Sequence, residues 1–349
     1  MPAERSNFVA DGAAAMTDDV EYLHAFCDLS PDAVLNAVEA VGYHCSGHVS
    51  ALNSYENRVY QVGIEDNAPL IAKFYRPGRW SDASILEEHA FTAELKAEEI
   101  PVIAPIADAH DRTLHHAGAH RLALYPRVGG RSPETDNPEH LRMLGHCIAR
   151  IHNIGALRLF EHRPALDIRN FAIEPSQFLF EQNFLPADIQ PAYGAIIKLL
   201  LERLHEVFAD SEDVALLRLH GDCHLGNILM RDDVPFIVDF DDARTGPAVQ
   251  DLWMFLSGDR ADRTAALYDV LDGYTEFRRF DARELRLLEA LRALRMIHYA
   301  GWLARRWDDP AFPRAFPWFN TQRYWEEHVL SLKEQYSALD EPSLQWQED

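Results

Sequence analysis

The 349-residue chain contains no apolar run that approaches the roughly 20 residues of a membrane-spanning helix. Its first residues, MPAERSNFVADGAAAMTDDVEY, are acidic and lack the basic and apolar segments that make up a signal or transit peptide. Both absences argue against a membrane or exported protein. We therefore expect a cytoplasmic protein with no membrane partner.

Cysteine is scarce and shows no CxxC pair or zinc-type ligand spacing. The four positions are scattered: Cys27, Cys45, Cys147 and Cys223. In a chain of this size they are most simply free thiols of a reducing compartment. The sequence also lacks a G-x-S-x-G elbow, a GxGxxG fingerprint and an internal repeat, which removes the usual marks of a nucleophilic hydrolase, a dinucleotide site and a repeat array.

Basic residues are few compared with acidic ones. Lys and Arg number 33 against 56 Asp and Glu, which gives a formal net charge of −23. Nucleic acid is therefore not expected as a partner, because its phosphates bind to a basic face. The acidic balance permits a cationic substrate, but solubility or a saline habitat accounts for it equally well.

The sequence does contain a polar loop between two apolar segments, LHGDCHLGNIL (219–229), followed by VDFDD (238–242). Asp222 precedes Asn227 by five residues, and Asp239 follows a short apolar strand. This is the spacing of a kinase catalytic loop and its metal-binding segment. Asp222 would accept or orient the proton of the attacking hydroxyl, while Asn227 and Asp239 would hold Mg²⁺ against the phosphates. The alternative is a turn whose polar residues only cap and solvate.

The segments before this loop predict a small antiparallel sheet. A capped helix over 30–42 precedes β-branched stretches at about 47–52, 57–64 and 69–75. The first two strands are joined by LNSYEN (52–57), where a protein kinase would carry a glycine-rich loop. This turn has no glycine, but a backbone amide or the Ser54 hydroxyl could donate to a phosphate. A simple hairpin turn is the alternative.

Lys73 ends an apolar strand, LIAKF, which resembles the strand whose lysine pairs with nucleotide phosphates in kinases. The helix expected over 81–99 offers Glu87 and Glu88 as its acidic partner, and Glu88 is preferred. Alternatively, Lys73 protects an edge strand from aggregation and Glu88 lies on a solvated helix face.

Further strands are expected at Val102–Ile106, Arg112–His116 and His120–Tyr125. The stretch Pro126–Gly130 then breaks the pattern. It is interpreted as a hinge that binds the adenine edge near Tyr125 and Val128, or as an ordinary flexible turn.

The rest of the chain is mainly helical by period. His152 is interpreted as a packed or capping residue, and the aromatic stretch after Trp302 as packing between C-terminal helices. Asp251, at the start of an expected apolar helix, is predicted to brace the catalytic loop. The expected division is a flexible tail (1–19), a nucleotide-binding lobe (20–125), a hinge (126–130) and a catalytic and substrate-binding lobe (131–349).

With Lys73, Glu88, the H-G-D of 220–222, Asn227 and Asp239 in order, the chain resembles the aminoglycoside phosphotransferase and choline kinase-like group. Within it, strings such as LNSYENRVYQ, KFYRP and RRWDDPAFPRAFPW resemble bacterial stress-response kinases. The resemblance covers roughly residues 30–345. It implies an α+β, two-lobed, protein-kinase-like fold with an N-terminal antiparallel sheet and helix and a larger, mainly helical C-terminal lobe.

The resemblance also implies a function. It indicates a cytoplasmic, monomeric serine/threonine protein kinase that uses ATP and Mg²⁺, autophosphorylates, and serves the envelope stress response and protection from cell death. Asp222 would be the proton acceptor, with Asp239 also catalytic, and Ser54 would contact ATP. Two alternatives stay open: a small-molecule kinase acting on an aminoglycoside, choline or homoserine, and a pseudokinase that binds nucleotide without turnover.

Cys223 lies next to Asp222 and is a candidate redox sensor. A neighbouring carboxylate raises the pKa of a thiol and makes the thiol less reactive. A small packing residue is therefore the favoured interpretation.

Overall fold

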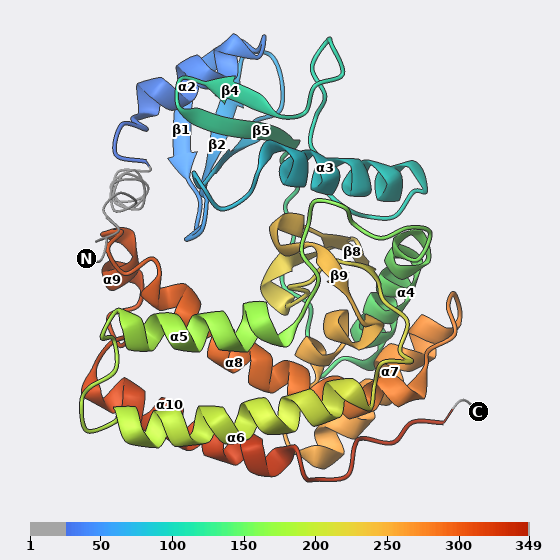
Figure 1. Cartoon of the computed structure of the whole chain (residues 1–349). Coiled ribbons are helices and arrows are strands. Elements are labelled where there is room, and N and C mark those ends of the chain that lie inside the picture. Colours follow the sequence, from blue (N-terminus) through green and yellow to red (C-terminus); the bar gives the residue numbers. More distant parts are fainter. Residues whose placement is uncertain (1–25, 348–349) are drawn as a thin grey trace, which may run out of the picture.

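The computed structural model describes residues 26–347 as an antiparallel sheet with two helices, followed by a larger helical part (Figure 1). The expected α+β class, with the sheet first and the helices second, is confirmed. The tail expected at residues 1–19 lies outside the described residues. No helix in the described range is long and apolar enough to cross a membrane.

The N-terminal sheet has five antiparallel strands in the order β1-β2-β3-β5-β4. Their bounds are β1 (Cys45–Ala51), β2 (Arg58–Ile64), β3 (Leu70–Tyr75), β4 (His115–Ala117) and β5 (His120–Pro126). Helix α2 (Pro31–Ala40) begins as expected, because the Ser30 hydroxyl accepts the N–H of Ala33. Its Val34 and Val38 side chains pack with Phe74 in a small core of the sheet.

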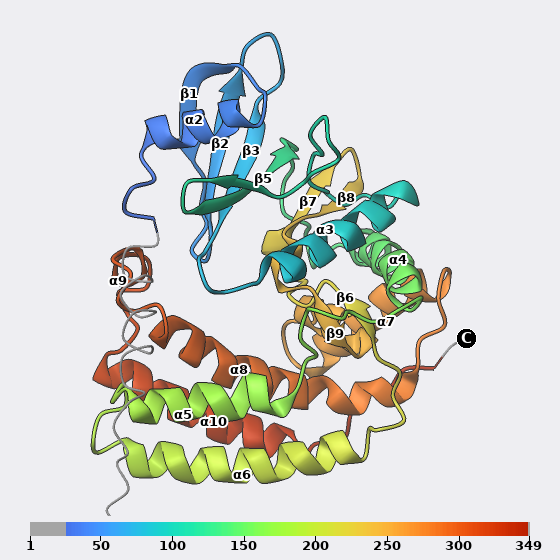
Figure 2. The same ribbon diagram turned by 45° about the horizontal axis from the view of Figure 1, so that its top comes forward.

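Helix α3 (Asp82–Ala97) lies between the sheet and the helical part (Figure 2). Ile85 packs with Tyr75 and Tyr125 of the sheet, whereas Phe91 and Leu95 belong to the core of the helical part. One helix therefore links the two cores, and it carries Glu88 on its buried side.

The prediction of a strand at Val102–Ile106 is wrong. This segment forms only a single bridge, between Val102 and Ile237. Pro101 precedes the segment and Pro105 lies within it, and each lacks the N–H that a ladder requires.

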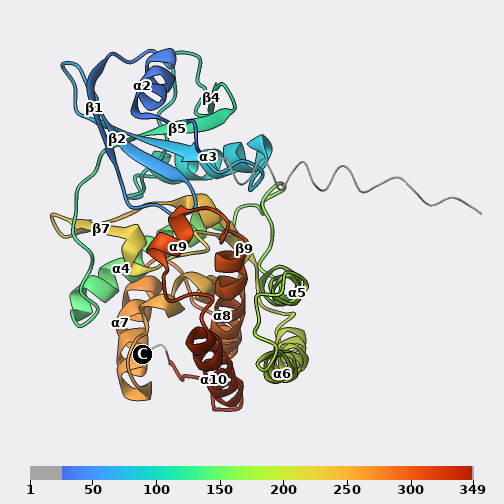
Figure 3. The ribbon, with the colours of Figure 1, turned by 90° about the vertical axis from the view of Figure 1, so that its left-hand side faces the viewer.

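The C-terminal part packs helices around two short antiparallel strand pairs. The helices are α4 (Pro138–Gly155), α5 (Glu174–Glu181), α6 (Gln190–Ala209), α7 (Arg260–Thr275), α8 (Leu288–Ala304), α9 (Ala311–Ala315) and α10 (Gln322–Ala338). The strands are β6 (Leu217–Leu219) paired with β9 (Arg244–Gly246), and β7 (Ile228–Arg231) paired with β8 (Val234–Ile237). Figure 3 shows α5 and α6 on one side of α8 and α10, and α7 on the other.

Two expectations for this part have different outcomes. The aromatic stretch packs between helices as expected: Trp325 is fully buried, and the Trp307 and Phe319 ring centroids are 4.9 Å apart. The prediction of an apolar helix that starts at Asp251 is wrong. Two short 3-10 turns, Ala248–Asp251 and Trp253–Phe255, replace it.

Candidate active site

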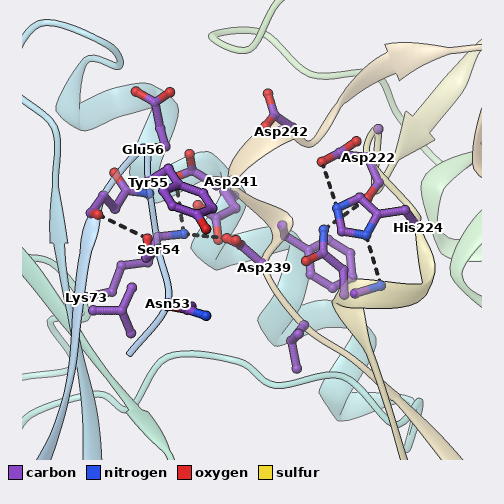
Figure 4. A pocket seen from close by; sticks show the side chains of 18 of the residues that line it. Asn53, Ser54, Tyr55, Glu56, Lys73, Asp222, His224, Asp239, Asp241 and Asp242 are labelled. Carbon is purple, nitrogen blue, oxygen red and sulfur yellow. Dashed lines mark hydrogen bonds and ion pairs between the residues drawn. The ribbon is translucent and has the colours of Figure 1, made fainter. Parts of the chain in front are cut away.

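A cavity of about 660 Å³ lies between the sheet and the helical part. All eight residues predicted for the site line it: Ser54, Lys73, Glu88, Tyr125, Val128, Asp222, Asn227 and Asp239. One end of the cavity is apolar and is bounded by β2, β3 and the segment that follows β5. The other end is bounded by α8 and by Phe316 in the segment that follows it. Figure 4 shows Asp239 between Lys73 on one side and Asp222 with His224 on the other.

The loop between β6 and β7 is held by a buried carboxylate. The two oxygens of Asp251 accept the N–H groups of His220 and Gly221, each at 2.8 Å, and His152 Nε2 lies 3.2 Å from one of them. Asp251 therefore braces the loop, and His152 is a packed core residue, as expected. Gly221 has a φ of +84°, and an added Cβ would collide with the carbonyl oxygen of Asp242. The glycine of the H-G-D string is thus required by backbone geometry.

Asp222 has a cationic partner that the sequence did not reveal. One carboxylate oxygen forms an ion pair with Arg295 of α8. The other lies 3.5 Å from His224 Nε2, and His224 Nδ1 accepts the N–H of Gly226 at 2.9 Å. That hydrogen bond places the ring proton on Nε2, facing Asp222. Nδ2 of Asn227 donates to the backbone oxygen of Asp222 at 3.0 Å, so its amide oxygen is the atom that can ligate a cation.

Asp239 follows β8 in a left-handed backbone conformation, with a φ of +61°. Its side chain is 52% exposed to the cavity, and one of its oxygens accepts from Lys73 Nζ at 2.9 Å. Lys73 is also 3.2 Å from Asp241. Burial alone would lower the pKa of Lys73, but Asp239 and Asp241 raise it well above its ordinary value. Lys73 is therefore a fixed positive charge beside Asp239.

The partner expected for Lys73 differs from the observed one. Within residues 26–347 no ion pair joins Lys73 to Glu88. The Lys73 ammonium group forms ion pairs with Asp239 and Asp241 instead. Glu88 is 2% exposed, and its nearest cationic atom is Arg163 Nη1 at 4.0 Å. Glu87 instead accepts N–H groups from the backbone of residues 161–163, which ties α3 to the segment after α4.

Burial raises the pKa of Glu88 to about 7, although Lys73 and Arg163 oppose the shift. Since the folded pKa lies above the unfolded value of 4.5, rising pH removes the proton from the unfolded chain first. The protein therefore loses stability between these two values.

Glu88→Gln is expected to remove this loss in the nucleotide-free protein. Relative to the wild type, the variant should gain up to about 3 kcal/mol of unfolding free energy from pH 5 to pH 8. Urea unfolding at both pH values measures the difference, and Glu98→Gln at the exposed end of α3 is the control. An equal variant-to-wild-type difference at both pH values would show that Glu88 does not titrate in this window.

The turn at residues 52–57 is tied to the helical part. Ser54 Oγ donates to the backbone oxygen of Asn57 at 3.0 Å. Glu56 is buried in a cationic cluster. It accepts a hydrogen bond from Trp302 Nε1 at 2.6 Å and forms an ion pair with Arg306, whose Nε lies 2.6 Å away. Arg76 joins the same cluster and pairs with Asp309 at 2.8 Å. Hydrogen bonds and ion pairs thus fix the turn that would cover the phosphates to α8 and to the segment after it.

The carboxylates of Asp241 and Asp242, which follow Asp239 in the chain, form ion pairs with arginines. Arg79 contacts Asp241 at 2.7 Å and Asp242 at 2.8 Å, and Arg244 contacts Asp242 at 2.6 Å. Burial alone would raise the pKa of both acids, but the neighbouring cations lower it below the ordinary range. The string FDD (240–242) was visible in the sequence, but the arginines that neutralise it were not.

Cys223 is fully buried beside Asp222. Burial, followed by the charge of Asp251, raises the pKa of its thiol well above the ordinary value. A neutral, inaccessible thiol is a poor nucleophile, so the interpretation as a packing residue holds.

A cavity with an H-G-D loop, a paired lysine and an exposed aspartate fits phosphoryl transfer, and comparison with known proteins agrees. The model of the phosphotransferase enzyme family matches residues 48–288. The chain belongs to the phosphotransferase enzyme family. Stress response kinase A of Escherichia coli (strain K12) is 44% identical over 321 residues, which cover 92% of this chain and 96% of that relative.

Two further proteins are similar to this chain, one in sequence and one in fold. A Salmonella typhimurium (strain LT2) relative, serine/threonine protein kinase RdoA, is 43% identical over 320 residues, with the same coverage of 92% and 96%. Among solved structures, amicoumacin kinase hAmiN in complex with AMP-PNP, Ca²⁺ and Ami has a TM-score of 0.69 at 19% identity, and the match covers 92% of this chain and 96% of that one. The last similarity concerns the fold alone. The two relatives that are 43–44% identical are both named kinases, and this phosphotransferase is a kinase.

Proposed function

We propose that this kinase is an ATP- and Mg²⁺-dependent serine/threonine protein kinase that acts in a bacterial envelope stress response and protects against cell death. The observation that carries the proposal is the presence of Lys73, Asp222, Asn227 and Asp239 in one cavity, in the order and spacing of a kinase. The protein acceptor is supported by the name of the relative that is 43% identical. A monomer in the cytoplasm that also phosphorylates itself completes the proposal.

The cavity has room for the nucleotide at its apolar end. The adenine would lie against Val59, Ile71 and Leu229, which line this end, and would be bound by the backbone near Tyr125 and Val128. Lys73 holds the phosphates, and Ser54 contacts them from the turn above. An attacking Ser or Thr hydroxyl would lie beside Asp222, whose carboxylate would accept its proton. The new O–P bond to the γ-phosphorus would form as the bond from that phosphorus to the β–γ bridging oxygen breaks, with ADP as the leaving group.

The donor atoms around Asp239 fit Mg²⁺. This cation prefers a few oxygen ligands and usually completes its shell with phosphate and water. The exposed carboxylate of Asp239 and the amide oxygen of Asn227 provide such ligands. When bound, Mg²⁺ supplies charge neutralisation at the phosphates.

The proposal is tested with labelled ATP. The purified protein is incubated separately with a protein extract and with a panel of amino alcohols that includes an aminoglycoside, choline and homoserine. Label in Ser and Thr residues of proteins is expected, and the Asp222→Asn variant serves as the catalytic control. Label confined to the amino alcohols would replace the proposal by a small-molecule kinase, and no turnover with any acceptor would indicate a pseudokinase.

A further inference from the structure

The end of the cavity beyond Asp222 is formed largely by one face of α8. Arg295, His298, Tyr299 and Trp302 recur at the three- and four-residue spacing of a helix and all line the cavity. Tyr55 and Phe316, whose ring centroids lie 4.8 Å apart, extend this wall, and the Phe316 ring lies 5.9 Å from that of Trp302. The acceptor hydroxyl has to enter at this end, because the apolar end is the one suited to adenine.

The carboxylates that face this end are already neutralised. Asp222 is paired with Arg295, and Asp242 is paired with Arg79 and Arg244. Glu56 is enclosed by the cluster that contains Arg306 and Trp302. A cationic acceptor would therefore have to compete with an arginine for Asp222, Asp242 or Glu56, despite the acidic composition of the chain.

Arg295 differs from the other arginines at this end. Its side chain is 37% exposed, whereas those of Arg79 and Arg244 are 13% and 7% exposed. Within residues 26–347 its one ion pair is with Asp222. A guanidinium has five N–H donors, so most of those of Arg295 are available to a bound molecule. The neighbouring His298 adds no positive charge, because burial, followed by the charge of Arg244, lowers its pKa to about 3.

We propose that Arg295 determines acceptor specificity by selecting substrates that carry a carboxylate close to the reacting hydroxyl. This inference rests on the proposed protein kinase function and defines its substrate class as Ser or Thr residues with acidic neighbours. The guanidinium bridges Asp222 and the carboxylate of the acceptor, which brings the hydroxyl to Asp222 and offsets the repulsion between the two acids. A Lys or Arg next to the acceptor residue would meet Arg295 and be repelled.

The experiment compares two peptides of equal length with one central Ser, flanked by Glu in one and by Lys in the other. The ratio of their kcat/KM values is measured at 0.15 M salt, where repulsion by the net charge of the protein is screened beyond about 8 Å. The wild type is expected to prefer the acidic peptide about tenfold or more, the effect of one charged hydrogen bond.

Arg295→Gln should bring this ratio close to one, and Arg295→Lys should retain a preference for the acidic peptide. The ratio is the useful readout, because a disturbance of Asp222 would lower both kcat/KM values by the same factor and leave their ratio unchanged. Arg323→Gln, at an exposed arginine of α10 that pairs with Glu327, is the matched control and should behave as the wild type. Circular dichroism and ATP binding verify that each variant is folded.

An unchanged ratio in Arg295→Gln, or a wild-type preference for the basic peptide, would overturn the inference while leaving the kinase function intact. Phosphorylation of neither peptide, together with turnover of small molecules, would instead overturn the proposed protein substrate. In that case the same ratio is measured on a hydroxy acid and an amino alcohol of equal size. A preference for the amino alcohol would then overturn the role of Arg295 as well.

Discussion

Asp222→Asn is expected to lower the phosphoryl-transfer rate by roughly 10²–10⁴-fold, the usual contribution of a general base. Asn has nearly the same shape as Asp, and its amide oxygen can still accept from Arg295, so the loop should keep its geometry. What it loses is the ability to take the proton of the acceptor hydroxyl. ATP affinity should change by less than about threefold, because the other residues that would contact the nucleotide are untouched.

Single-turnover kinetics measures the rate, and calorimetry measures ATP affinity. Asp233→Asn is the matched control, because Asp233 is exposed in the β7–β8 turn and has a positive φ, which Asn tolerates. Full activity in Asp222→Asn would refute the assignment of Asp222 as the base.

Asp239→Asn is expected to remove both activity and the effect of Mg²⁺ on nucleotide binding. The left-handed backbone at Asp239 is accessible to Asn, so the substitution changes charge with little strain. Lys73 keeps its contact with Asp241, which limits the loss of stability. The Mg²⁺-dependent part of ATP affinity should fall at least about tenfold and the rate about 100-fold or more.

Calorimetric titration of ATP with and without MgCl₂ measures this effect. The pattern distinguishes the two acids: Asp222→Asn should lose rate and keep affinity, whereas Asp239→Asn should lose both. If Mg²⁺ strengthens ATP binding equally in Asp239→Asn and in the wild type, Asp239 is not a metal ligand.

Much of this site could be predicted from the sequence because its parts are local. Asp222 and Asn227 belong to one loop, and Asp239 follows the next short strand pair, so their spacing along the chain nearly dictates their spacing in space. The same holds for Asp251, which is close enough in the chain to return beneath the loop and accept its N–H groups. Helix α2 was located by its cap and its valines for the same reason.

The errors arise where tertiary contacts override local pattern. Residues 102–106 are apolar enough for a strand, but prolines at 101 and 105 limit pairing to one bridge. The segment after Asp251 is apolar enough for a helix, but it turns tightly so that Asp251 can reach the loop. Glu88 has the right place in its helix, yet Lys73 contacts two carboxylates that approach from the other part of the chain.

The sequence by itself predicted the fold class and brought Asp222, Asn227 and Asp239 together, because these depend on residue type and short spacing. Tertiary structure alone decided what surrounds them. Arg295 pairs with Asp222 across 73 residues, and Trp302 donates to Glu56 across 246. No pattern along the chain encodes such pairs, since they exist only once α8 packs beside the loop and beneath the sheet. The charge around Asp222 at the α8 end of the cavity is therefore a property of the packed molecule, whereas the loop that carries Asp222 was recognised from the sequence.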